Sequence, residues 1–156
     1  MKRWTMTILC LALILAMTAC GGTSTSEAKT LGGKLVNLFQ TEIDKGEDIL
    51  SIAEQMASAD FNSYDCVAQE MPAGYMPGFT EEISGFKRAV CFCPMIGSVP
   101  FVGYIFEVDG DAEGFKQKLE KLADPRWNIC TEAQETVSCV SGNFVFFAMC
   151  PGEDQP

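Results

Sequence analysis

The chain has 156 residues and is strongly acidic, since 21 Asp and Glu residues face 11 Lys and Arg residues and give a formal net charge of −10. This balance disfavours nucleic-acid binding, because affinity for nucleic acid comes largely from neutralisation of phosphates by Lys and Arg. The sequence contains no histidine, which excludes Ser-His-Asp and Cys-His catalysis and removes the commonest metal ligand.

The first 19 residues have the layout of a secretory signal peptide. Lys2 and Arg3 precede a mostly apolar run over residues 6–17. This run is shorter than the roughly 18 residues that a helix needs to cross a bilayer, and no later segment reaches that length, so we expect no transmembrane helix. The motif Met17-Thr18-Ala19-Cys20 resembles the lipobox of bacterial lipoproteins, in which the cysteine is joined to diacylglycerol and becomes the mature N-terminus. An ordinary signal peptide cut near Ala19 is the alternative.

Lipid on Cys20 would hold the protein at the extracytoplasmic face of the cell membrane. Two acyl chains give stable attachment, because each buried methylene contributes about 0.8 kcal/mol. The 137 residues after the signal peptide carry nine basic and 21 acidic residues, a net charge of −12 that disfavours contact of the domain with anionic lipid. We predict a signal peptide over 1–19, the lipidated cysteine and a flexible tether over 20–32, one α+β domain over 33–151 and an acidic tail over 152–156.

Residues 34–59 predict amphipathic helical structure, since their apolar side chains recur at intervals of three and four residues. Gly46 interrupts this pattern, and the acidic pair Glu47 and Asp48 suits the start of a second helix. One bent helix and two short helices both fit. We expect this region to cover a sheet.

Residues 60–85 show no sustained period. Two prolines and two glycines within residues 71–79 predict an irregular loop. Met and aromatic side chains make an adaptable apolar surface, and loops often carry function. The candidate binding residues of this loop are Met71, Tyr75, Met76 and Phe79. A loop folded down over the core is the alternative.

Two strands are predicted over residues 87–93 and 101–108. The second places Phe101 and Ile105 on one face and several apolar residues on the other, so it should lie inside a sheet with cover on both faces. The residues on that other face are Val102, Tyr104, Phe106 and Val108. A helix is then predicted over residues 111–123, ended by a proline.

A closing hairpin is predicted around Gly142. A two-residue turn there pairs Ser141 with Phe144 and Cys139 with Phe146. Together the elements predict an α+β domain, in which an antiparallel or mixed sheet of about four strands is covered by an N-terminal helix and a central helix in the order α-β-β-α-β-β.

Six cysteines follow Cys20, and outside the cytoplasm they are able to persist as disulfides. Six thiols allow fifteen full pairings, and their spacings lack the paired CxxC signature of zinc sites. Cys91 and Cys93 are candidate reactive thiols on one face of a strand, whereas Cys139 and Cys150 fall too far apart to be bridged. Buried thiols, structural disulfides and redox or metal chemistry stay open, and we predict no metal site and no cofactor. The six are Cys66, Cys91, Cys93, Cys130, Cys139 and Cys150.

Residues 125–132, with the sequence PRWNICTE, and the hairpin that follows resemble a recurring element of small lipoproteins of unknown function from Gram-positive bacteria. The run Ala19-Cys20-Gly21-Gly22 is similar too. The resemblance covers about the C-terminal half of the chain and implies no known activity. Within it, Arg126 and Trp127 are a candidate surface pair, which either packs the helix against the hairpin or presents a cation and a ring to a partner.

From these features we expect a non-enzymatic, lipid-anchored module at the extracytoplasmic face of the cell membrane. It would bind an envelope protein or a small ligand through the loop 71–79 and contact the membrane through the lipid on Cys20. A thiol-based redox or metal-handling lipoprotein is the alternative.

Overall fold

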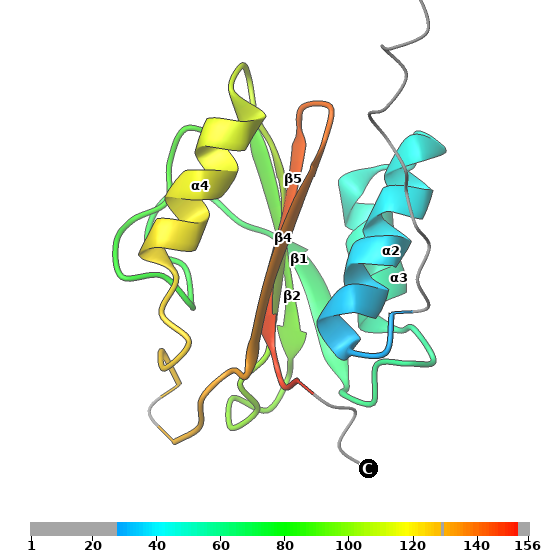
Figure 1. The fold of residues 1–156 in the computed structure, drawn as a ribbon, viewed down its shortest axis with the longest axis vertical. Coiled ribbons are helices and arrows are strands. Elements are labelled where there is room, and N and C mark those ends of the chain that lie inside the picture. The colour runs from blue at the N-terminus through cyan, green and yellow to red at the C-terminus, as the bar shows by residue number, and fades with distance from the viewer. Residues whose placement is uncertain (1–27, 129, 153–156) are drawn as a thin grey trace, which may run out of the picture.

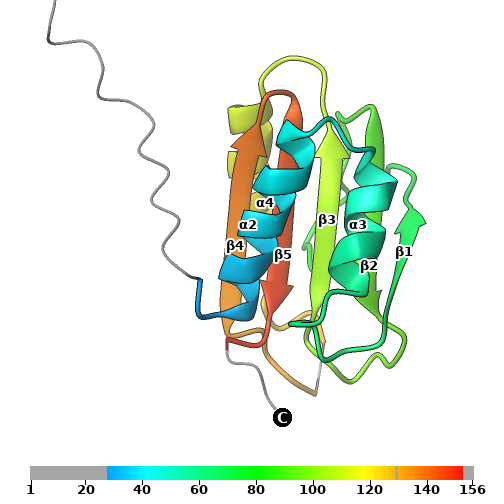
Figure 2. The same cartoon turned by 90° about the vertical axis from the view of Figure 1, so that its right-hand side faces the viewer.

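A five-stranded antiparallel sheet lies between two layers of helix in the computed structural model, which describes residues 28–128 and 130–152 (Figures 1 and 2). The predicted signal peptide, Cys20 and residues 153–156 of the acidic tail lie outside the described residues. The elements in chain order are α2 (Leu31–Asp44), α3 (Ile49–Ala57), β1 (Cys66–Glu70), β2 (Arg88–Pro94), β3 (Val102–Glu107), α4 (Ala112–Leu122), β4 (Glu135–Ser141) and β5 (Phe144–Cys150).

The strands lie in the order β1-β2-β3-β5-β4, and every neighbouring pair is antiparallel. Helices α2 and α3 cover one face of the sheet and α4 covers the other (Figure 1). The α+β class and the cover by an N-terminal and a central helical region are therefore confirmed. Helix α4 carries the chain from the central strand β3 past β5 to the outer strand β4.

Strand β3 is buried on both faces, as its sequence predicts. Phe101 and Ile105 join the cluster under α2 and α3, whereas Tyr104 and Phe106 join the cluster under α4. Each of these four side chains is at most 2% exposed. Because a large apolar side chain contributes about 1.5–3 kcal/mol when fully buried, neither face tolerates the loss of its helices.

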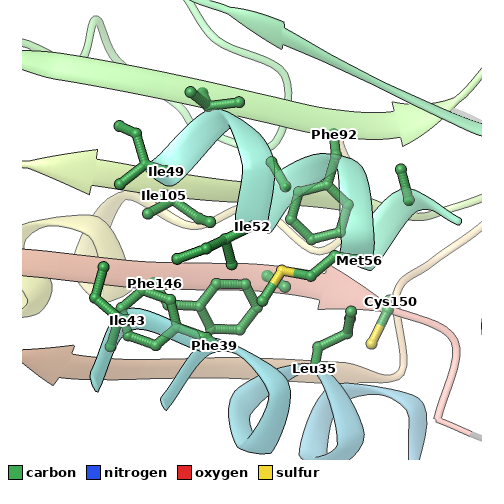
Figure 3. Close-up of a cluster of buried hydrophobic side chains, with 14 of the residues drawn as sticks. Leu35, Phe39, Ile43, Ile49, Ile52, Met56, Phe92, Ile105, Phe146 and Cys150 are labelled. Carbon is green, nitrogen blue, oxygen red and sulfur yellow. The ribbon is translucent and has the colours of Figure 1, made fainter. Parts of the chain in front are cut away.

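Aromatic rings fill the core on the α2–α3 side (Figure 3). The ring of Phe39 from α2 stacks on Phe146 of β5 with centroids 5.4 Å apart. Ile52 and Met56 of α3 are fully buried in the same cluster, and Phe92 of β2 lies beside them. Helices α2 and α3 thus share one continuous core.

The N-terminal helical region consists of two short helices, one of the two predicted arrangements. Gly46 between them has a φ of +82°, and Asp48 caps the second helix by accepting a hydrogen bond from the Leu50 N–H. Arg88 of β2 contacts the carboxylates of Asp48 and Glu70, each at 2.7 Å. The hydrogen bond from Arg88 lowers the pKa of Asp48, so this link weakens as the pH falls into the acid range.

Helix α2 starts at Leu31, earlier than the predicted boundary between tether and domain at 32/33. The Thr30 hydroxyl accepts from the Gly33 N–H and donates to Glu135 Oε1 at 2.7 Å. The Gly32 N–H donates to the other oxygen of the Glu135 carboxylate at 3.2 Å, so a negative charge sits at the positive end of the helix. Leu31 itself is buried. The first residues of the domain are thereby fastened to the start of β4.

The sequence did not predict strand β1. This five-residue edge strand lies in the region predicted to be irregular and pairs with β2. Its inward side chains, Cys66 and Ala68, are only partly buried, while Val67 faces outward with 43% exposure. So short an alternation does not stand out from the loop residues around it. The C-terminal hairpin, in contrast, has the predicted register, with Cys139 opposite Phe146.

The close packing of the Phe92 ring against Gly103 provides a test of the fold. A Cβ at this position of β3 would meet the ring of Phe92 on the neighbouring strand. We therefore expect Gly103→Ala to lower the free energy of unfolding by about 1–3 kcal/mol in a urea titration. Gly97→Ala is the matched control, because nothing lies within 4 Å of its Cβ, and it should change stability by less than about 0.5 kcal/mol. Equal stabilities of the two variants would contradict the packing described for Phe92.

Candidate functional site

Two loops meet at the end of the sheet where β2 ends and β3 begins. The β2–β3 loop spans residues 95–101, and the segment between α4 and β4 spans residues 123–134. The Asn128 side-chain amide donates to the Gly97 carbonyl at 2.6 Å, and the Thr131 hydroxyl donates to the Ser98 carbonyl at 3.2 Å. These bonds hold the loops together and define the walls of a site.

An apolar pocket of about 510 Å³ lies between these loops. Its wall includes Cys93, Phe101, Trp127 and Cys130, and none of its lining residues is an Asp, Glu, Lys or Arg. We call it the Cys93–Trp127 pocket. Its volume falls in the range of small-molecule sites, which are mostly apolar with a few polar groups. In so acidic a chain, a hollow without a carboxylate in its wall is a distinctive chemical environment.

The rim of the Cys93–Trp127 pocket carries exposed apolar side chains. Ile96 lines the pocket and is 69% exposed, and its neighbour Met95 is 74% exposed. Val99 separates the pocket from a larger hollow of about 910 Å³, whose wall includes Ser63 and Glu132 and is more polar. The apolar hollow is therefore the stronger candidate for binding an apolar group.

Cys91 and Cys93 lie on the pocket side of β2, as their spacing predicts. A hydrogen bond from the Cys91 thiol lowers the pKa of Cys93 to about 7, while partial burial opposes this effect. The same hydrogen bond and burial raise the pKa of Cys91, which is only 3% exposed. Cys93 is the thiol that faces the pocket, so it is the better nucleophile of the two.

All six described cysteines are free thiols in the structure, and Cys139 and Cys150 are not bridged, as predicted. Burial raises the pKa of Cys66 to about 11 and the pKa values of Cys139 and Cys150 to about 12. Cys130 is exposed at the pocket. Among residues 28–128 and 130–152, no group of three or more Cys, Asp or Glu residues is arranged to hold a metal ion.

The loop 71–79 does not present its four candidate residues on one surface. Met76 and Phe79 are only 3% and 9% exposed, and the Phe79 ring lies 5.0 Å from Phe147 in the core. Tyr75 is 77% exposed, whereas Met71 is half-buried beside a different hollow. The prediction of a shared binding surface therefore needs correction, because Met76 and Phe79 follow the alternative of a loop folded over the core.

Hydrogen bonds to its backbone carbonyls hold the loop 71–79 against the core. The Tyr104 hydroxyl donates to the Pro77 carbonyl at 2.8 Å, and the Asp124 N–H donates to the Gly78 carbonyl at 2.9 Å. Gly78 has a φ of +90°, and a Cβ there would meet Met149. Pro77 also borders the Cys93–Trp127 pocket. The loop 71–79 therefore contributes Pro77 to the wall of the pocket.

Arg126 and Trp127 are neighbours in sequence that point to different environments. Trp127 is half-buried, packs against the α4-side core and lines the pocket, in agreement with a packing role. The Arg126 side chain is 78% exposed and has an ion pair of 3.7 Å with Glu132, which contributes little at such exposure. The two residues therefore do not act as one surface pair.

Sequence reasoning missed the exposed residues Met95 and Ile96. An apolar pair between two strands looks like a continuation of the core, and only tertiary structure reveals that it faces solvent. The signal that was present is the lack of any charged residue over residues 94–100. A connection that the core does not bury is normally polar.

Comparisons of this chain with protein-family models, with curated proteins and with solved structures found no match. The resemblance to small lipoproteins of Gram-positive bacteria therefore stays a prediction. Among the described residues, no helix has both the length and the apolar character needed to cross a membrane.

The thiols provide a test of this site. In a protein that comprises residues 20–156 and carries Cys20→Ser, we expect an aromatic disulfide reagent to react with Cys93 and Cys130 under native conditions and with all six cysteines after unfolding. With Cys130→Ser, the rate at Cys93 should level off above about pH 8, because its pKa is about 7. Cys91→Ala should move this profile to higher pH.

Cys139→Ala is the control for that shift, because Cys139 packs on the opposite face of the sheet and should leave the profile unchanged. A rate at Cys93 that keeps rising tenfold per pH unit up to about pH 8.5 would contradict the lowered pKa. Fewer than six thiols after unfolding without reductant would reveal a disulfide.

Proposed function

We propose that this protein is a lipid-anchored, non-enzymatic binding module at the extracytoplasmic face of the cell membrane, and that it holds an apolar group of a small ligand or envelope protein in the Cys93–Trp127 pocket. The observation that carries the binding role is the pocket of about 510 Å³, whose wall is mostly apolar and contains no Asp, Glu, Lys or Arg, with exposed Ile96 at its rim. The anchor rests on the lipobox-like motif that ends at Cys20.

The lining of the pocket favours binding over acid–base catalysis. General acid–base chemistry needs a carboxylate, an imidazole or a similar group placed against the substrate. The pocket has no carboxylate and no imidazole in its wall, so its two thiols are the only groups there that could take this role, and its Asn128 amide already donates to the Gly97 carbonyl. Such a lining desolvates an apolar group and fixes it by shape.

Incorporation of labelled palmitate tests the anchor. We expect the label on the full-length protein expressed in a Gram-positive host, and we expect Cys20→Ala to abolish it, since the acyl chains are carried by that cysteine. Cys10→Ala is the control, because Cys10 lies within the apolar run and should leave the label unchanged. Label that persists in Cys20→Ala would remove the proposed anchor.

Binding of the apolar dye anilinonaphthalene sulfonate by the unlipidated Cys20→Ser protein tests the pocket. Trp127 is the only tryptophan in residues 20–156, so energy transfer from it detects dye bound to the domain, and the variants locate the bound dye. We expect Ile96→Ser to raise the Kd of the dye about fivefold, because roughly 1 kcal/mol of apolar contact is lost.

Two controls separate this site from other surfaces. Val67→Ser removes an exposed apolar side chain of the edge strand β1 and should leave the Kd unchanged. Tyr75→Ser tests the loop 71–79 in the same way. If Tyr75→Ser weakens dye binding and Ile96→Ser does not, the loop and not the pocket is the binding surface.

A thiol-based redox protein is a second candidate, favoured by the presence of Cys93 and Cys130 at one pocket. In the reaction with the aromatic disulfide, the Cys93 thiolate would displace one aryl thiolate and form a mixed disulfide. Cys130 would then attack the Cys93 sulfur, lose its proton and release the second aryl thiolate, leaving a Cys93–Cys130 disulfide. A cross-linked peptide in the mass spectrum supports this candidate, and two separate mixed disulfides remove it.

A further inference from the structure

The described chain begins at the same end of the sheet as the exposed pair Met95 and Ile96. Thr30 is bonded to Glu135, the first residue of β4. Glu135 pairs with Cys150 at the end of β5, and the adjacent Met149 pairs with Val102 at the start of β3. Figure 2 shows the start of α2 and the β2–β3 loop at this same end.

Chain length limits how far this end lies from a lipid on Cys20. Eight residue steps separate Cys20 from Ala28, the first described residue. A fully extended chain covers at most about 3.5 Å per step, or about 28 Å, and a flexible one averages about 16 Å. An anchored domain would therefore keep its β2–β3 loop within reach of the bilayer surface.

The tip of this loop has the chemistry of a membrane contact. Residues 94–100 contain no charged side chain, and Met95 and Ile96 are 74% and 69% exposed. The apolar surface of this tip is small, since Met95 and Ile96 are its two exposed large apolar side chains, whereas a stable protein–protein interface buries more than about 1,000 Å² in total. Insertion into lipid needs no such complementary area, because each buried methylene contributes about 0.8 kcal/mol.

We propose that Met95 and Ile96 insert into the outer surface of the bilayer that carries the Cys20 lipid, so that the domain stands on the end that holds its pocket. This inference rests on the proposed lipid anchor. The tether makes insertion intramolecular, with an effective concentration in the millimolar range, so a contact too weak for a free domain becomes populated.

Electrostatics sets the depth and lipid preference of this contact. Asp65 lies next to the tip, since its carbonyl accepts from the Met95 N–H at 3.0 Å, and Glu132 lies in the adjoining segment. These carboxylates resist approach to anionic lipid. Insertion is therefore shallow, limited to the two apolar side chains, and stronger on zwitterionic phosphatidylcholine than on phosphatidylglycerol.

Fluorescence quenching by brominated acyl chains tests this proposal on the lipidated mature protein in phosphatidylcholine vesicles. With Trp127→Phe as background, a single tryptophan is placed by Ile96→Trp, by Tyr75→Trp or by Asn143→Trp. The last two are matched controls, because they put the same membrane-seeking ring on other exposed positions of the same tethered domain. We expect quenching at position 96 at least threefold stronger than at position 143.

Hydrogen exchange then tests the native side chains. Amides of residues 95–98 should exchange at least threefold more slowly on vesicles than in the unlipidated Cys20→Ser protein, and Met95→Ser combined with Ile96→Ser should abolish the difference.

The outcomes separate the proposal from the anchor on which it rests. If the protein floats with vesicles but position 96 is quenched no more than position 143, insertion of the tip is overturned and the anchor stands. If the protein does not float, the anchor itself fails and the inference falls with it. If the Cys20→Ser protein sediments as a dimer that Ile96→Ser dissociates, the tip binds a second copy of this chain, and the proposal is again overturned.

Discussion

Strands β3 and β5 carry large apolar side chains on both faces, and this demands helices on both sides of the sheet. Helices α2 and α3 alone would leave Phe106 and Phe147 in water, a loss of about 1.5–3 kcal/mol for each side chain. Helix α4 must therefore cover the second face, and the chain has to return from it to the outer strand β4. That return brings the segment 123–134 to the end of the sheet where the β2–β3 loop lies, and the pocket forms where these two connections meet.

Much of this architecture follows from periodicity in the sequence. Apolar side chains on alternate and on successive positions of residues 101–108 predict a central strand, and the intervals within residues 34–59 predict helices. The sequence is weaker where an element buries little. Strand β1 has only two partly buried side chains, and the start of α2 depends on Glu135, a residue more than 100 positions away that a local pattern does not reveal.

The candidate site was harder to predict, because its residues become neighbours only through tertiary contacts. Met76 and Phe79 suggested an adaptable surface by composition, yet the packing of Phe79 on Phe147 turns the same residues into core. Met95 and Ile96 show the reverse, since they look like core and are exposed. Apolar character alone does not decide whether such a side chain is buried or exposed. That depends on whether another segment of the chain packs against it.

The distribution of charge along the chain bears on the proposed contact between Met95, Ile96 and the membrane. With nine basic and 21 acidic residues over residues 20–156, the net charge disfavours contact of the domain with anionic lipid. Packing of the core does not require apolar residues at positions 95 and 96, because both side chains are exposed. A polar loop would be more soluble, so the absence of charged residues over residues 94–100 favours an apolar contact at this loop. Ile96 belongs both to that loop and to the pocket, and a membrane contact of Ile96 would therefore place the opening of the pocket at the membrane interface.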